Sequence, residues 1–316
     1  MFLFIQLLVI GLLITTTNSC KKDDTIDPII KKDVLITWAN PADITEGTAL
    51  SATQLNATAD VAGTFVYTPA IGTVLSGGAN QNLKVDFTPT DAVNYNTATK
   101  TVTINVTNVF TDPRDGNVYH TVTIGTQIWM VENLRYLPSV TGPGTGSQTV
   151  PYCYVYGYNG TVVADAKATS NYTTYGVLYN WTAAMNGAAS STANPSGVQG
   201  VCPTGWHLPS DAEWTQLTTY LGGESVAGGK LKETGTTHWD SPNAGATNET
   251  GFTALPGGYR DWDSTFYNVG YYGYWWGATE GNAGSALDRY VGYDDGEVGS
   301  YYSYEEVGFS VRCVRD

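Results

Sequence analysis

Histidine and cysteine, which often serve as nucleophiles, proton carriers and metal ligands, are scarce in this sequence: its 316 residues include three histidines and four cysteines. His120, His207 and His238 occur in no H-E-x-x-H or related spacing, and no C-x-x-C pair is present. The G-x-S-x-G elbow of serine hydrolases and the G-x-x-x-x-G-K-[ST] phosphate loop are absent as well. We therefore expect no catalytic residues, no metal centre and no cofactor.

Positive charge is also scarce. The chain has 15 Lys and Arg residues against 29 Asp and Glu residues, a net charge of -14. A protein that binds nucleic acid normally presents a basic face, so this composition argues against a nucleic-acid partner. The chain has one long hydrophobic run, FLFIQLLVIGLLI near the N-terminus. That run is too short to span a bilayer comfortably and is typical of a signal peptide.

The residues after the hydrophobic run read TTTNSC, and Ser19-Cys20 resembles the lipobox of bacterial lipoproteins, in which the cysteine is lipidated and becomes the mature N-terminus. The alternative is an ordinary secretory signal. The following KKDDTIDP resembles the surface-export tags of Bacteroidota lipoproteins. We expect a signal peptide at 1–19, a tether at 20–32, and a lipid-anchored protein of the outer membrane that faces outward.

Residues 33–108 are predicted to form an all-β immunoglobulin-like sandwich. Five short segments, VLITW, ALSATQL, GTFVYTP, NLKVDFTP and TATKTVTINV, alternate or are rich in β-branched residues, and Pro, Gly, Asn and Asp separate them. The text resembles the bacterial immunoglobulin-like repeats of surface proteins. Such a module would serve as a stalk, with carbohydrate binding as the alternative.

Residues 109–316 are predicted to form an α+β domain. A hairpin is expected with strands 118–124 and 127–130 around Gly125-Thr126. The segment 176–187 has helical spacing of apolar residues.

The clearest helix lies in PSDAEWTQLTTYLGG, where Ser210 and Glu213 form an S-x-x-E capping box. This box assigns Glu213 a structural role. His207, next to Trp206, is likewise expected to be structural. From Gly251 onward short β-segments follow one another to the end of the chain.

Several motifs occur in a fixed order: IGTQIWMVENLRYL, YGVLYNW, GVCPTGWHLPSDAEW, GGKLKETGTTHW, GFTALPGGYR, GYWWGATE and GFSVRCVRD. Together they resemble the Fibrobacter succinogenes major paralogous domain over about residues 110–316. HLPSDAEW and GFSVRC are also similar to formylglycine-generating and related sulfatase-modifying proteins. The resemblance implies a C-type lectin-like fold for 109–316 with a loop-rich face.

Formylglycine-generating enzymes hold copper with two neighbouring cysteines, whereas Cys313 is the one cysteine near the C-terminus of this chain. The interpretation is a structural disulfide between Cys202 and Cys313, which ties the closing strand to the segment that enters the capped helix. Cys153 is then a free thiol.

The stretch 270–306 is crowded with Tyr, Gly, Ser and Asp and holds one cation, Arg289. Tyr offers a large contact area at low rotamer cost, and Ser and Gly adapt to polar ligands, so this composition favours a recognition surface for an extracellular protein or glycan. The alternative is a sheet with aromatic cross-strand pairs, which is expected for Tyr274, Trp275 and Trp276. The candidate ligand-binding residues are Tyr271, Tyr272, Asp288, Tyr290, Tyr293, Asp294, Asp295, Glu297, Tyr301, Tyr302 and Tyr304.

The same stretch carries acids of the kind that bind calcium, Asp288, Asp294, Asp295, Glu297, Glu305 and Glu306, although YDDGEV also suits a turn. Calcium is therefore a secondary hypothesis. The composition of 261–306 is also what adenine mutagenesis of Asn codons produces in the variable proteins of diversity-generating retroelements.

Taken together, the sequence predicts a surface lipoprotein that displays a non-enzymatic ligand-binding domain. The alternatives are an envelope structural or adhesion protein without a specific small ligand, and an enzyme related to sulfatase-modifying factors.

Overall fold

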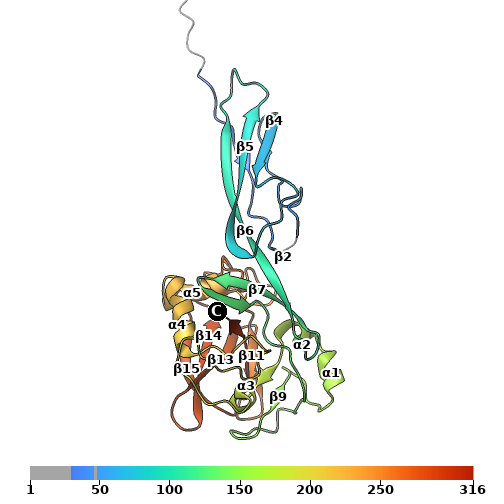
Figure 1. The fold of residues 1–316 in the computed structure, drawn as a ribbon, viewed down its shortest axis with the longest axis vertical. Helices are drawn as coiled ribbons and strands as arrows, with labels where there is room; N and C mark the ends of the chain where they lie inside the picture. The colour runs from blue at the N-terminus through green and yellow to red at the C-terminus, as the bar shows by residue number, and fades with distance from the viewer. Residues whose placement is uncertain (1–29, 46–47, 316) are drawn as a thin grey trace, which may run out of the picture.

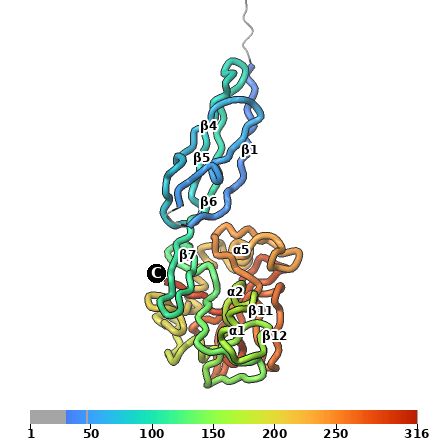
Figure 2. Tube along the Cα trace, turned by 90° about the vertical axis from the view of Figure 1, so that its right-hand side faces the viewer, coloured from blue at the N-terminus to red at the C-terminus, as the bar shows by residue number. Residues whose placement is uncertain are grey.

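The structure, a computed structural model, describes residues 30–45 and 48–315. The predicted signal peptide, Cys20 and the tether up to residue 29 lie outside the described residues. A slender β-module (30–106) stands on one end of a wider head, as Figure 1 and the turned view in Figure 2 show. No helix in the described part of the chain is long and apolar enough to span a bilayer.

The β-module consists of a two-stranded sheet and part of a seven-stranded sheet, and its apolar side chains form one core. Its strands are β1 (Ile36–Thr37), β2 (Ile44–Thr45), β3 (Thr58–Ala59), β4 (Gly63–Thr68), β5 (Gly78–Pro89) and β6 (Ala98–Thr111). β4, β5 and β6 pair in antiparallel order, β2 adds to β6, and β1 pairs with β3. Trp38, Leu83 and Phe87 lie in the core between the sheets. The prediction of a β-rich module is confirmed.

One predicted strand of the module is wrong. ALSATQL forms a turn over residues 52–54 and has only an isolated bridge from Ala49 to Val74. The Gln54 side chain accepts hydrogen bonds from the backbone and hydroxyl of Ser51, which closes the turn locally. Local bonds of this kind compete with strand pairing.

β6 runs without a break through the predicted domain boundary at 108/109. Its first part pairs with β5, and Asn108–Thr111 pair with β7 of the head. The two parts of the chain therefore share a strand, which fixes their relative position better than a loop would.

The first head sheet continues from β6. β7 (Val118–Ile124) and β8 (Gln127–Met130) form the predicted hairpin, and Gly125 supplies a positive φ of 64°. The C-terminal strand β17 (Val314–Arg315) pairs with β8, so both ends of the head meet in one sheet.

A second sheet of six strands has the order β15-β14-β13-β16-β10-β9. Its strands are β9 (Cys153–Tyr154), β10 (Leu178–Tyr179), β13 (Tyr272–Glu280), β14 (Ser285–Gly292), β15 (Gly299–Tyr304) and β16 (Phe309–Ser310). A two-stranded ribbon lies beside it, formed by β11 (Gly257–Arg260) and β12 (Phe266–Val269).

Five short helices complete the described head: α1 (Val163–Lys167), α2 (Ser170–Tyr175), α3 (Trp181–Met185), α4 (Asp211–Tyr220) and α5 (Glu224–Leu231). The predicted capping box of α4 is confirmed. Glu213 is fully buried and also accepts from the Ser196 amide at 3.0 Å, and it lies 2.5 Å from Nε2 of His207. Both residues thus contribute to the frame of the head.

The helix predicted over 176–187 begins later than expected. Leu178 and Tyr179 form β10 between β9 and β16, and only Trp181–Met185 are helical. The Asn180 side chain caps this helix by accepting from the Ala183 amide. Burial between two strands outweighs the helical spacing of the apolar residues.

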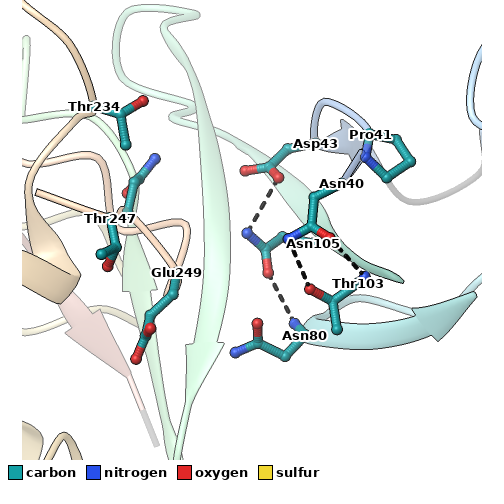
Figure 3. Close-up of a pocket in the computed structure, with 10 residues that line it drawn as sticks. Asn40, Pro41, Asp43, Asn80, Thr103, Asn105, Thr234, Thr247 and Glu249 are labelled. Atoms are coloured by element: carbon teal, nitrogen blue, oxygen red, sulfur yellow. Dashed lines mark hydrogen bonds between the residues drawn. The ribbon is translucent and has the colours of Figure 1, made fainter. Parts of the chain in front are cut away.

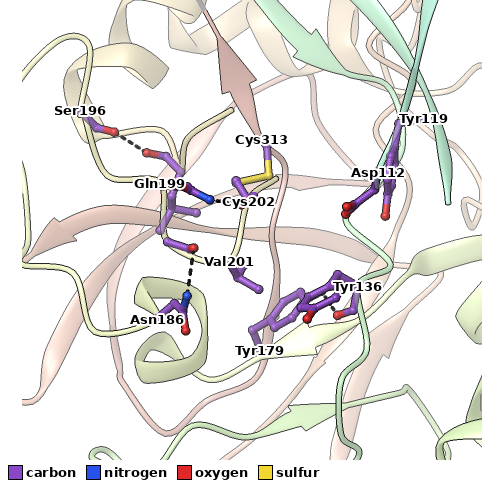
Figure 4. Close-up of a disulfide and its surroundings, with 12 residues drawn as sticks. Asp112, Tyr119, Tyr136, Tyr179, Asn186, Ser196, Gln199, Val201, Cys202 and Cys313 are labelled. Carbon is purple, nitrogen blue, oxygen red and sulfur yellow. Dashed lines mark hydrogen bonds between the residues drawn. A yellow bond between two sulfur atoms is a disulfide. The ribbon is translucent and has the colours of Figure 1, made fainter. Parts of the chain in front are cut away.

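The predicted disulfide is confirmed: Cys202 and Cys313 are bonded, with Cα atoms 5.9 Å apart (Figure 4). The bond ties the loop after α3 to the end of the chain just before β17. Cys153 is free and buried, and burial raises the pKa of its thiol to about 12. A thiol in this state is a poor nucleophile.

Replacing Cys202 and Cys313 together by Ala should lower the free energy of unfolding by about 3–5 kcal/mol, because the bond closes a long loop in the unfolded chain. Cys153→Ala serves as the control, with a cost of about 1 kcal/mol. Denaturant unfolding with and without reductant measures both effects. Equal midpoints for the reduced and oxidised wild type would contradict this role.

Candidate functional site

The tyrosine-rich stretch folds into β13, β14 and β15, and residues of these strands line an open groove of about 800 Å³. Ligand pockets typically measure roughly 300–1,000 Å³, so the groove is of a suitable size. Seven tyrosines, one tryptophan and one phenylalanine line it, together with polar side chains. The lining residues are Tyr259, Asp261, Trp262, Asn268, Tyr272, Tyr274, Asn282, Ser285, Asp288, Tyr290, Tyr301, Tyr302, Ser303, Tyr304, Val307 and Phe309.

Strand register brings the aromatic rings together. Tyr274 lies opposite Tyr290 in the β13–β14 pair, with ring centroids 5.9 Å apart. Tyr274 also stacks on Phe309 at 5.1 Å. Gly299 lies opposite Tyr290 on β15, and a Cβ at this glycine would overlap with the Tyr290 ring. Glycine at 299 therefore leaves the space that the ring fills.

Asp288 lies at the floor of this groove and is only 1% exposed. Its Oδ2 accepts a hydrogen bond from the Ser303 hydroxyl at 2.7 Å. Its Oδ1 is buried and has no hydrogen-bond partner among the described residues. Burial raises the pKa of this carboxyl from 3.8 to about 7. A buried polar atom without a partner costs free energy, so it calls for an explanation.

Arg289, the one cation of the stretch, points to the opposite face of the sheet. Its guanidinium pairs with Asp211 of α4 and with Glu224 of α5, the latter at 2.6 Å. Because neighbouring residues of a strand face opposite sides, Asp288 and Arg289 cannot meet. The groove is left with two carboxylates, Asp261 and Asp288, and no Lys, Arg or His among its lining residues.

Six predicted site residues line the groove: Tyr272, Asp288, Tyr290, Tyr301, Tyr302 and Tyr304. Asp288 was predicted to belong to the ligand-binding face, and its side chain lines the groove but is buried. Tyr301, Tyr302 and Tyr304 are all more than half exposed.

The other five predicted residues lie outside the groove, at or next to the loop that joins β14 to β15. Tyr271 and Tyr293 pack edge to face at 5.1 Å, and Tyr293 rests on an apolar core cluster. Asp294, Asp295 and Glu297 belong to the loop itself.

Lys232 holds this loop by donating to the backbone carbonyls of Gly292 and Asp295 at 2.7 and 2.6 Å. The lysine is fully buried, and burial lowers its pKa to about 8. Gly228 of α5 makes room for the loop, since a Cβ there would overlap with the Glu297 carbonyl. The loop thus has a structural role in the head.

The acids considered as calcium ligands do not gather. Within residues 30–45 and 48–315, no group of three or more His, Cys, Asp or Glu side chains is arranged to hold a metal ion. Asp288 bonds to Ser303 in the groove, while Asp294, Asp295 and Glu297 lie in the β14–β15 loop.

Several groove residues lie outside the stretch that the sequence pointed to. Tyr259 lies on β11, Asn268 on β12 and Trp262 in the loop between them, and they approach the groove from outside the 270–306 stretch. Tyr274, expected to form aromatic cross-strand pairs, is half-buried and lines the groove, whereas Trp275 and Trp276 are buried. Trp262 is 61% exposed, and a tryptophan in the short turn RDWDS is the signal that could have indicated it.

A second cavity of about 520 Å³ lies where the β-module meets the head (Figure 3). Asn105 donates to Asp43 at 3.1 Å and accepts from the Asn80 amide at 2.8 Å, so these groups satisfy one another. Thr234, Thr247 and Glu249 face them from the head. No aromatic side chain lines this cavity, which favours a structural role at the junction.

The chain was compared with known proteins. No curated protein and no solved structure matches it. The model of one family, described as the Fibrobacter succinogenes major domain, matches residues 122–315, which is more than half of the chain and includes every strand of the groove. The chain therefore belongs to the Fibrobacter succinogenes major domain family.

Proposed function

We propose that this protein is a cell-surface lipoprotein whose head binds an extracellular ligand, without catalysing a reaction, through the tyrosine groove. The observation that carries the proposal is the groove itself: seven tyrosines line it together with a buried carboxylate whose Oδ1 has no partner among the described residues. Aromatic side chains of this kind supply most of the binding energy in protein interfaces.

The exposed rings support recognition over packing. Tyr301 is 68% exposed, and Tyr302 and Tyr304 are also exposed, so water covers much of their apolar surface in the unbound protein. Exposed aromatic patches of a soluble domain commonly mark interaction sites. Tyrosine is well suited to this role because few rotatable bonds are fixed when it binds.

Asp288 supports the proposal because it lowers the stability of the fold. In the unfolded chain its pKa is close to 3.8, while in the folded protein burial raises the pKa to about 7. The folded state therefore holds the proton more tightly, and stability falls as pH rises from about 4 to about 7. A residue that costs stability is typical of a functional site.

The arrangement of the two parts suits the display of the head at the cell surface. We assign an immunoglobulin-like sandwich to the β-module and a C-type lectin-like fold to the head, in keeping with the family and with the β-rich structure. The described chain begins at the end of the β-module away from the head (Figure 1). A lipid on Cys20 would hold that end at the outer membrane and leave the head farthest from the bilayer.

We further propose that the protein is the variable protein of a diversity-generating retroelement. Thirteen of the 16 lining residues are Tyr, Asp, Asn or Ser, which are products of adenine mutagenesis of Asn codons or Asn itself. The structure thus gathers these residue types at one surface. An adenine-rich near-copy of the coding region beside a reverse-transcriptase gene would support this, and flanking DNA without either would refute it.

The double variant Tyr301→Ala/Tyr302→Ala tests the groove. Both rings are exposed, so the melting temperature should stay nearly unchanged, with a cost of about 0.5 kcal/mol per site. Binding of the full chain to an array of immobilised glycans and peptides should fall sharply, by about 2 kcal/mol or more. Tyr220→Ala, an equally exposed tyrosine on α4, is the matched control.

Wild-type binding that survives in the double variant would exclude the groove as the site. An array on which the wild type binds nothing would count against a ligand-binding head as such.

Asp288→Asn should stabilise the fold at about pH 8 by roughly 2–4 kcal/mol, because it removes the cost of a buried charge. The gain should shrink at about pH 5, where the folded protein already carries the proton on Asp288. Asp294→Asn, which makes the same charge change on the exposed loop, should have an effect within about 0.5 kcal/mol. Chemical denaturation at both pH values measures this, and a destabilised Asp288→Asn variant at pH 8 would refute the account.

Cys20→Ala tests the anchor. The wild type should incorporate a palmitate analogue and be digested by protease added to intact cells, and the variant should lose the label. Equal labelling of both proteins would show that Cys20 is not lipidated. Protection of a labelled wild type in intact cells would place the head inside the envelope.

A further inference from the structure

The charged groups of the tyrosine groove all have one sign. Asp261 and Asp288 line it, and no lining residue is Lys, Arg or His. The cations nearby are already engaged: Arg289 pairs with acids on the far face of β14, and Arg260 donates to the Pro143 carbonyl at 3.0 Å and to the Glu306 carbonyl at 3.1 Å. An anionic ligand would therefore meet repulsion without compensation.

The aromatic walls add to this preference. A cation within about 6 Å of a tyrosine ring is attracted by the negative face of the ring. Tyr272, Tyr274 and Tyr290 form a continuous series, with centroids 5.8 Å apart from Tyr272 to Tyr274 and 5.9 Å apart from Tyr274 to Tyr290. A positively charged group on the groove floor could contact several of these rings at once.

The unpartnered Oδ1 of Asp288 favours a cation that carries hydrogen-bond donors. Its Oδ1 needs a hydrogen-bond donor, which a primary ammonium supplies and a quaternary ammonium lacks. A neutral hydroxyl could also donate, but it would leave the buried negative charge without a counter-charge. The floor therefore combines a demand for positive charge with a demand for N–H donors.

We propose, on the basis of the function proposed above, that the groove takes a protonated primary amine, the side chain of a lysine on a partner protein. The lysine stem would lie along the aromatic walls while its ammonium reaches Asp288, as long cationic side chains do on apolar surfaces. The groove is large enough for the side chain and its neighbours in the partner.

The amine can reach Asp288 only if a neighbouring side chain moves, because Oδ1 is covered in the unbound protein. Tyr301 lies directly opposite Asp288 in the β14–β15 pair and is 68% exposed. Binding would require this exposed ring of the edge strand to turn away from Asp288, a movement that leaves the core undisturbed.

Binding should depend on pH. Trp276 of β13 and Tyr301 of β15 lie opposite Asp288, Ser303 donates to it, and Tyr274 and Tyr290 lie next to it on β13 and β14. None of these side chains is an acid, a histidine or an amine. Arg289 lies on the opposite face, paired with acids, and Asp261 is the second groove carboxylate. Burial raises the pKa of Asp288 to about 7, so below neutral pH a proton competes with the amine for this carboxylate.

The probe is a capped Gly-Gly-Lys-Gly-Gly peptide, titrated calorimetrically into the full chain beside versions whose lysine is acetylated or trimethylated. We expect saturable binding of the lysine peptide and at least tenfold weaker binding of both modified peptides. The affinity should rise about tenfold between pH 6 and pH 8, as expected for a carboxyl that titrates near 7.

Asp288→Asn should weaken binding of the lysine peptide at least tenfold at about pH 8 and abolish the pH dependence, while Asp294→Asn should leave both unchanged. Because the Asn variant is expected to fold more stably, loss of binding cannot be ascribed to unfolding. Equal affinity for lysine and acetyl-lysine peptides would overturn the proposal. So would equal affinity for the trimethylated peptide, which cannot donate to Oδ1.

Different results would exclude the lysine ligand alone or the groove as a binding site. A wild type that ignores the lysine peptide but binds a glycan on the array, in a manner lost in Tyr301→Ala/Tyr302→Ala, would refute the amine and retain the groove. A wild type that binds neither would refute both.

Discussion

The alternation of side chains along β14 determines which residues face the groove and which face the helices α4 and α5. Asp288 and Arg289 are neighbours in sequence, so they must point to opposite sides of the sheet. Arg289 meets Asp211 and Glu224 and joins the sheet to α4 and α5. Asp288 faces the tyrosines and keeps an unpartnered oxygen. The cation of this stretch thus stabilises the fold, while its buried acid is left for the groove.

The frame that holds these strands is well suited to a groove of fixed shape. The Cys202–Cys313 bond and the pairing of β17 with β8 close the head on itself. β6 belongs to both the β-module and the head, so the two parts share one hydrogen-bonded ladder. Lys232 holds the loop between β14 and β15 in place by hydrogen bonds to its backbone carbonyls. With this support the exposed tyrosines can point to solvent at little cost to the fold.

Local signals in the sequence were enough to predict several elements. The Gly125-Thr126 turn between alternating segments identifies the hairpin, and Ser210 with Glu213 identifies the start of α4. Elements that depend on contacts between residues far apart in the sequence could not be predicted from such signals. Leu178 and Tyr179 have helical spacing, yet they form a strand because Cys153 and Phe309, far away in sequence, come to lie beside them.

In the candidate site, too, some residues could be predicted from local sequence and others depend on long-range contacts. Composition alone identified six residues that line the groove, because tyrosines beside small polar residues are typical of recognition surfaces. Composition could not separate them from Tyr271 and Tyr293, which lie just before β13 and just after β14 and do not line the groove. Tyr259 and Trp262 were missed because the β11–β12 ribbon reaches the groove only in the folded chain. The burial of Asp288 likewise follows from strand pairing and cannot be read from the local sequence ALDRYVG.

The most direct test of this account is nuclear magnetic resonance of the full chain with isotope-labelled tyrosine rings, titrated with the lysine peptide. The account predicts that the ring signals of Tyr274, Tyr290 and Tyr301 move together as the peptide saturates, while those of the buried Tyr119 and Tyr179 stay in place. Saturating peptide that leaves the three groove signals unmoved, or shifts confined to Tyr271 and Tyr293, would contradict it.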